Sequence, residues 1–180
     1  MQLILSLTPD RNPSYDDVQQ IIRKKNTDHP LMGHYFRIQK EKIRRSRLSA
    51  SAKSGLQIYE TLCIICHGKD GKGVKEGKVL LGPPLRGNRW FKDHRLDAIV
   101  RILLKGETGP IGDTEYGEGI MLPLEAAYNN KQLSDLINYI GLTWNGWRDI
   151  VKPEQIKTIR EEVKDRKLPY TNEELEALKK

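Results

Sequence analysis

Three segments of the chain carry apolar residues at helical spacing, one every three or four positions. Between residues 55 and 67 they stand at positions 56, 59, 62, 63 and 66, which predicts an amphipathic helix. The segment 93–105 repeats the rhythm, with Asp93 as its N-cap and Gly106 as its stop, and so does the segment 131–142. No apolar–polar alternation typical of strands persists anywhere, so we predict an all-α fold.

Helix signals at both ends of the chain extend this core. Ser14 is placed to cap a first helix, and a second is expected over 35–48. Pro153 opens a helix over 154–167, and Thr171 with Glu174 forms a capping box for a short last helix. Glycine and proline cluster between 68 and 119, which indicates loops. We therefore divide the chain into a basic helical segment, linker or end of a larger upstream domain (1–54), a central domain (55–145) and a C-terminal helical extension (146–180).

The chemistry of the chain centres on the run Cys-Ile-Ile-Cys-His at residues 63–67, which contains its only two cysteines. Cys-x-x-Cys-His is the attachment signature of c-type haem. Two thiols one helical turn apart, Cys63 and Cys66, can each add to one haem vinyl group. His67 then lies under the iron, where its imidazole can serve as the proximal ligand.

Other uses of the motif fit the sequence less well. A structural zinc site needs four ligands, but no further cysteine is present, and His29, His34 and His94 are scattered singly. A thioredoxin-like redox pair would follow a strand, whereas this motif follows a helical pattern and runs into a glycine-rich loop. We therefore expect one covalent haem c per chain.

The residues around the motif resemble a class I c-type cytochrome with a single haem. Gly55 and Tyr59 stand eight and four residues before Cys63, where this family has a glycine and an aromatic on its first helix. Leu136 and Tyr139 match the family's last helix, which crosses the first. The resemblance covers residues 55 to about 145. It implies a cytochrome c-like helical domain around one covalent haem, with extra helices at both termini.

The segment 82–87 resembles the Gly-Pro-x-Leu-x-Gly loop of the same family. The resemblance implies that the carbonyl of Pro83 accepts the Nδ1–H of His67 and strengthens its donation to iron. It also implies that Leu85 packs on the porphyrin. Trp90 is a candidate to donate its indole N–H to a haem propionate, with packing in the core as the alternative.

Met121 is the candidate for the sixth iron ligand. It lies 54 residues after His67, in a glycine-rich loop before the last family helix, where the family keeps its methionine. The alternatives are that Met121 only fills the core, or that His94 is the second axial ligand. A thioether ligand favours Fe(II) and closes the iron to small ligands, which suits an electron carrier rather than a catalyst.

The resemblance implies electron transfer. Met-x-Pro at 121–123 and the closing Pro-Glu-Gln-Ile at 153–156 resemble the cytochrome modules at the C-terminus of bacterial periplasmic dehydrogenases. Such a module accepts electrons from a dehydrogenase centre and passes them to a respiratory acceptor, another cytochrome or a terminal oxidase. The alternative is a haem enzyme or gas-binding protein, peroxidase-like, with a displaceable sixth ligand.

The charge and the start of the chain bear on its partners and location. The net charge is +7, and residues 1–54 carry 11 basic and 5 acidic side chains. No nucleic-acid motif accompanies this basic run, so we read it as a solvated helix face or linker. No stretch is long enough for a membrane span, and residues 1–7 do not form a convincing signal peptide. Since haem is attached outside the cytoplasm, we expect a periplasmic or otherwise extracytoplasmic protein whose leader or upstream domain is missing.

The charges of the central domain are unevenly placed along the sequence. Residues 69–105 hold ten basic and four acidic side chains, whereas residues 106–145 hold one basic and six acidic ones. The first stretch belongs to the His67 side of the haem and the second to the Met121 side. We therefore expect a dipole that orients the redox partners.

Overall fold

The computed structural model describes residues 33, 38, 48–111, 116, 120–148 and 150–178. The chain divides into two compact units, residues 1–48 and 49–180, and the description below concerns the second. The division falls a few residues before the predicted boundary at Gly55, because Ser49 caps a helix there and accepts a hydrogen bond from the Ala52 N–H. The helices expected from Ser14 and over 35–48 fall outside the described residues, apart from single positions.

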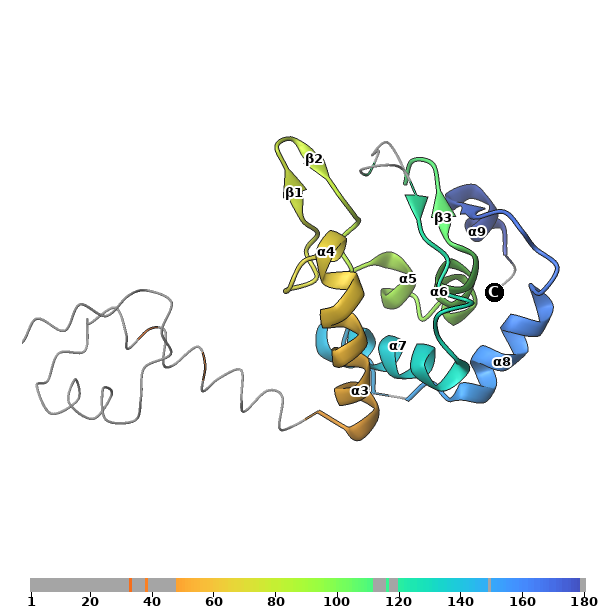
Figure 1. Cartoon of the computed structure of the whole chain (residues 1–180), viewed down its shortest axis with the longest axis horizontal. Coiled ribbons are helices and arrows are strands. Elements are labelled where there is room, and N and C mark those ends of the chain that lie inside the picture. The colour runs from red at the N-terminus through yellow and green to blue at the C-terminus, as the bar shows by residue number, and fades with distance from the viewer. Residues whose placement is uncertain are drawn as a thin grey trace, which may run out of the picture. The chain divides into compact units, whose positions relative to one another are not determined.

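The unit from Ser49 onwards is mostly helical, which confirms the predicted class (Figure 1). Its helices are α3 (Ala50–Ile58), the π-helical turn η1 (Tyr59–Cys63), α4 (Ile64–His67), α5 (Arg89–Lys92), α6 (Leu96–Lys105), α7 (Asn130–Trp144), α8 (Pro153–Glu162) and α9 (Asn172–Ala177). The described residues also form five strands of two residues each, which were not expected: β1 (Lys75–Glu76), β2 (Val79–Leu80), β3 (Glu107–Thr108), β4 (Ile120–Met121) and β5 (Tyr170–Thr171).

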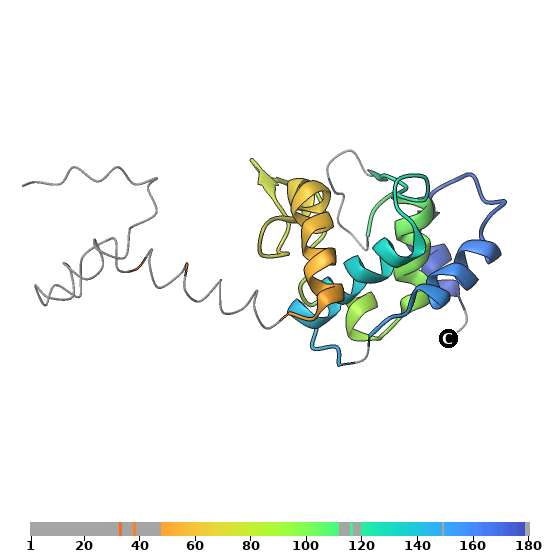
Figure 2. The same cartoon turned by 60° about the horizontal axis from the view of Figure 1, so that its bottom comes forward.

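The helices α3 and α7 cross closely and form the centre of the fold (Figures 1 and 2). Gly55 permits the approach, since a Cβ atom there would lie 1.9 Å from the carbonyl oxygen of Asp135. One turn further on, the rings of Tyr59 and Tyr139 meet with centroids 5.4 Å apart, and both residues are buried. Leu136 is fully buried beside them. The expected crossing of the first and last family helices is therefore present.

The predicted helix over 93–105 begins at Leu96 in the structure, as α6, and a separate short helix, α5, precedes it. Asn88 caps α5, and Asp93 ends it, so the prediction that Asp93 caps the longer helix was wrong. His94 follows with a φ of 53°, in the left-handed region, and the chain then enters α6 at Leu96 with Arg95 as its N-cap residue. The Asn88 side chain caps α5 by accepting the N–H of Trp90, whereas Arg95 makes no side-chain capping bond to α6.

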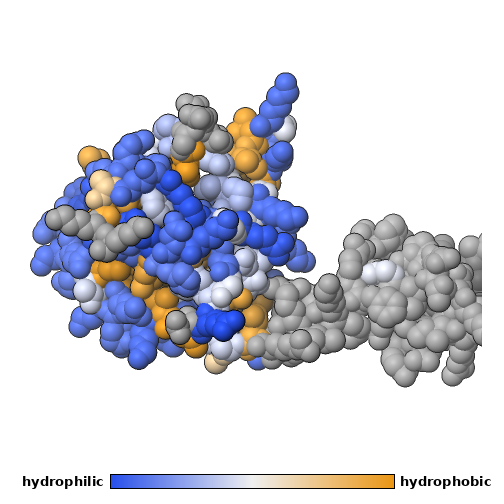
Figure 3. Space-filling view, turned by 180° about the vertical axis from the view of Figure 1, so that it is seen from behind, coloured by the Kyte–Doolittle hydropathy of each residue, from blue (hydrophilic) through white to orange (hydrophobic). Residues whose placement is uncertain are grey.

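The C-terminal extension packs on the same unit. Its helix α8 lies against α6 and α7, and α9 begins with the predicted capping box of Thr171 and Glu174. Between them β5 pairs in parallel with β3, which in turn pairs antiparallel with β4. The face seen in Figure 3 is mostly hydrophilic, with separate apolar patches. None of the helices in the described part of the chain is long and apolar enough to cross a bilayer.

Candidate haem site

The two cysteines and His67 lie where the first long helix ends. The π-helical turn η1 closes at Cys63, and the single turn α4 then carries Cys66 and His67. A π-helical turn widens the helix locally and is often found at functional sites. The Tyr59 hydroxyl spans this turn, since it donates to the carbonyl of Gly68 at 2.6 Å. This bond ties the end of the motif back to the crossing of α3 and α7.

The imidazole of His67 is held in one orientation. Its Nδ1 lies 2.8 Å from the carbonyl oxygen of Pro83, which is the contact that the family resemblance implied. A carbonyl oxygen can only accept, so Nδ1 carries the hydrogen and Nε2 keeps its lone pair. Burial lowers the pKa of His67 below its usual range, although the bond to Pro83 opposes this shift. The ring is therefore a neutral imidazole, the form that binds a metal.

These residues line a largely apolar cavity in two adjoining parts, of about 220 and 320 Å³. The two volumes together fall within the range usual for ligand and cofactor sites. Both parts are bordered by Cys63, His67, Pro83, Glu107, Ile111, Tyr116 and Met121. Two thiols at the edge, a neutral imidazole on one wall and apolar side chains elsewhere fit a covalently attached haem.

The remaining candidate residues also border this cavity. Leu85 and Trp90 line its larger part, and Trp90 is buried with the guanidinium of Arg89 over its ring at 4.2 Å. Met121 lies on β4, far from His67 in sequence but on the wall of the same cavity. The fold thus brings together all seven residues that we expected at the cofactor.

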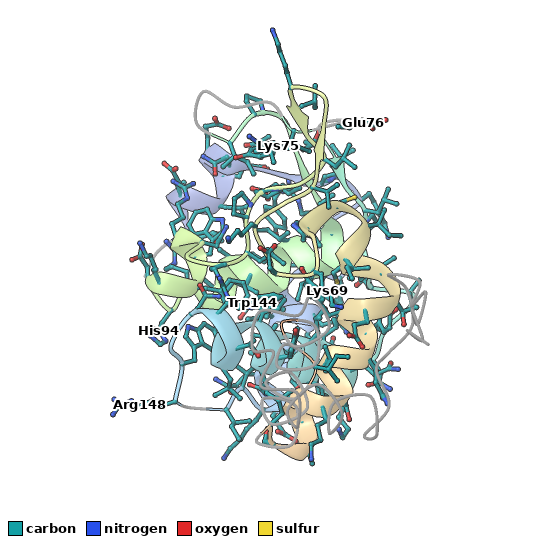
Figure 4. All side chains as sticks on the ribbon, turned by 90° about the vertical axis from the view of Figure 1, so that its left-hand side faces the viewer. Lys69, Lys75, Glu76, His94, Trp144 and Arg148 are labelled. Atoms are coloured by element: carbon teal, nitrogen blue, oxygen red, sulfur yellow. The ribbon has the colours of Figure 1, made fainter. Side chains whose placement is uncertain are left out.

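His94, the alternative axial ligand, does not border the cavity. Its ring is exposed and stacks on Trp147 with centroids 5.1 Å apart. Figure 4 shows His94 at the left side of the molecule, on the same side as Arg148 and well away from Lys75 and Glu76 of the β1–β2 hairpin near the top. The ring is therefore on the surface and does not face the cavity in which the iron would be bound.

Glu107 is a residue of this cavity that the sequence did not reveal. It follows Gly106 directly, and a charged residue just beyond a helix ordinarily faces water. In the structure it is only 8% exposed, because β3 lies between β4 and β5. Burial raises the pKa of its carboxyl to about 7, against the opposing charge of Arg89. No local pattern could have predicted this position.

One curated relative comes from Stutzerimonas stutzeri (strain A1501) and is described as a thiosulfate dehydrogenase. It is 33% identical to this chain over 69 residues, a match that takes in 34% of this chain and 22% of that enzyme. The chain thus spans about a fifth of the length of the curated relative it matches.

The family comparison agrees with the geometry of the site. The family model described as cytochrome c matches residues 52–144, just over half of the chain. The match contains the cysteines, His67, Pro83 and Met121. Members of this family bind c-type haem covalently, and Cys63, Cys66 and His67 have the required spacing. This chain belongs to the cytochrome c family.

Proposed function

We propose that the chain transfers single electrons through one covalent haem c, with His67 and Met121 as its axial ligands. The observation that carries this proposal is that one cavity is bordered by both cysteines, by a His67 ring whose Nδ1 is already used by Pro83, and by Met121. Family membership supports the coarser function, electron transfer on a haem. The ligand pair is our inference from the cavity and from the family resemblance.

When bound, haem c supplies a one-electron Fe(III)/Fe(II) couple, and a thioether ligand favours the reduced state. The chain's own residues keep the surroundings apolar and hold the proximal ring. Ile99, Ile102 and Leu103 of α6 line the larger part of the cavity together with Trp90, and these apolar side chains exclude water. At the smaller part Leu62 and Leu122 border the cavity and are also exposed, at 37% and 71%. They give a redox partner an apolar contact close to the cofactor.

We further propose that the donor is a dehydrogenase centre and the acceptor a respiratory protein, another cytochrome or a terminal oxidase. The relative described as a dehydrogenase and the resemblance of the C-terminal segment to dehydrogenase modules support this assignment. Cytochrome c domains are typically extracytoplasmic, which supports a periplasmic location. On this proposal the chain is an electron-carrying module or subunit rather than the enzyme itself.

Replacing Met121 with alanine tests the ligand assignment. The variant should keep its covalent haem, shown by mass spectrometry, because Cys63 and Cys66 form the thioether bonds. It should lose the weak sulfur-to-iron band at the red end of the oxidised spectrum and bind carbon monoxide when reduced. Leu122→Ala, at the exposed neighbouring position, is the matched control and should keep the wild-type spectrum.

Two outcomes would contradict the proposal. A wild-type protein that carries no haem after expression with a haem-attachment system would rule out the cytochrome function. A wild-type protein that readily binds carbon monoxide would show an open iron and favour the alternative of a haem enzyme or gas-binding protein.

A further inference from the structure

Glu107 borders both parts of the haem cavity and is the one acidic side chain that does so among the described residues. It lies on β3 opposite Met121 of β4, and its side chain is buried. One carboxylate oxygen, Oε1, is inaccessible to solvent and has no hydrogen-bond partner in the protein. Buried polar atoms nearly always have a partner, so an unpartnered carboxylate oxygen at a cofactor cavity calls for a functional explanation.

The cations nearby do not neutralise Glu107 by direct pairing. Arg89 also lines the cavity, but its guanidinium is held by Asn172 and Glu176 of α9, at 2.6 Å from the carboxylate of Glu176. Lys105, two residues before Glu107, pairs with Glu125 at 2.5 Å. The described part of the chain contains no ion pair to Glu107. Its charge therefore acts inside the cavity with little screening by solvent.

Resting on the haem electron transfer proposed above, we propose that Glu107 is a determinant of the reduction potential. A negative charge at the wall of the haem cavity stabilises Fe(III) relative to Fe(II), because the oxidised centre carries one more positive charge. The carboxylate thus opposes the preference of the Met121 thioether for Fe(II). Since β5 of the C-terminal extension pairs with β3, the extension helps to hold this charge in place.

The test compares the reduction potentials of Glu107→Gln, Glu107→Leu and a control by spectroelectrochemistry at about pH 8, above the pKa of the carboxyl. Glu173→Gln is the matched control, because it removes the same charge from an exposed position on α9. Both Glu107 variants should be easier to reduce. At a fixed ambient potential we expect their Fe(II)/Fe(III) ratio to rise by about tenfold, equivalent to about 59 mV for one electron. The control should stay at the wild-type value.

The leucine variant protects the test against a folding failure. It replaces a buried carboxyl that lacks a partner by an apolar side chain, so it should be at least as resistant to urea as the wild type. The inference is overturned if either folded variant, with the haem attached and an unchanged red-end band, keeps the wild-type potential. A wild type without haem or without that band would instead overturn the proposed function, so the two failures are distinguishable.

Discussion

Gly55 decides how closely α3 and α7 can approach. Atoms of α7 fill the space that a side chain at this position would need. An added Cβ would lie 1.9 Å from the carbonyl oxygen of Asp135 and 2.8 Å from the Cβ of Tyr139. A rigid backbone atom cannot move aside as the end of a flexible side chain can. The same crossing supports η1 through Tyr59, and η1 delivers the haem motif. A single missing side chain thus positions the cofactor site.

Gly55→Ala should destabilise the protein by about 3 kcal/mol, the upper end of what overpacking of a core costs. The two helices would have to separate, and the contact of Tyr59 with Tyr139 would loosen with them. Urea unfolding of the haem-containing protein measures the loss. Lys53→Ala, exposed on the same helix, is the control and should change stability by less than about 0.5 kcal/mol. Equal stability of the two variants would show that the helices separate freely.

At the scale of elements, the C-terminal extension completes the wall that carries Met121. The N–H of Tyr170 donates to the carbonyl of Gly106 at 3.0 Å, just where β3 begins. At Gly106, φ is 82° and an added Cβ would lie 2.3 Å from the carbonyl oxygen of Met121. One three-stranded sheet thus joins the extension to Met121, with β3 between β5 and the strand β4 that carries the methionine. The other end of the extension is held by Arg95, which donates to the carbonyl of Leu175.

Tyr170→Pro should loosen the strand that carries Met121, the proposed sixth ligand, because proline has no N–H to donate to Gly106. We expect a weaker red-end band and faster binding of carbon monoxide to the reduced protein. Tyr170→Ala is the matched control, since it loses the ring but keeps the backbone donor. If the two variants have the same spectrum and binding rate, the backbone pairing of β5 does not hold the methionine strand.

At the scale of the whole molecule, fewer charges are free to attract a partner than the sequence suggested, because several of them are paired or buried in the structure. Of the acidic residues after Gly106, Glu107 is buried at the cavity, while Glu125 and Asp135 pair with lysines. Asp113, Glu115 and Glu118 lie outside the described residues. On the basic side several arginines are also paired, for example Arg101 with Glu162 of α8 at 2.7 Å.

The β1–β2 hairpin keeps its positive charge. Lys75 and Lys78 are exposed, and within the described residues neither has an ion pair closer than 4 Å. The hairpin projects beyond the helices (Figure 1), and β2 leads directly into Leu81, which borders the haem cavity. We expect an acidic partner to approach this side, with the charges acting mainly on the rate of association.

Reversing both charges, Lys75→Glu with Lys78→Glu, should slow electron transfer with such a partner by more than about tenfold at low salt. The effect should shrink as added salt shortens the Debye length to about 8 Å. Stopped-flow measurements over a range of ionic strength check this. Lys157→Glu, exposed on α8, is the control. An equal, salt-independent effect of the control and the double variant would show that the hairpin does not steer docking.

The haem motif, the helical periods and the capping box of Thr171 and Glu174 could be predicted from the sequence. Each depends on residues within a few positions of one another, so local geometry determines it. The family loop similarly placed Pro83 against His67. These local features were enough to predict both the helical class and the cofactor.

The tertiary structure alone decided the features that join distant residues. Strands of two residues are too short to show an alternation of apolar and polar residues. The local sequence therefore could not predict that β5 would pair with β3. Glu107 is buried because β3 pairs with β5, more than sixty residues further along the chain. Similarly, Arg89 is hydrogen-bonded to Asn172 and paired with Glu176, which lie more than eighty residues after it. Charge and burial at that wall are set by neighbours in space, which the order of residues does not reveal.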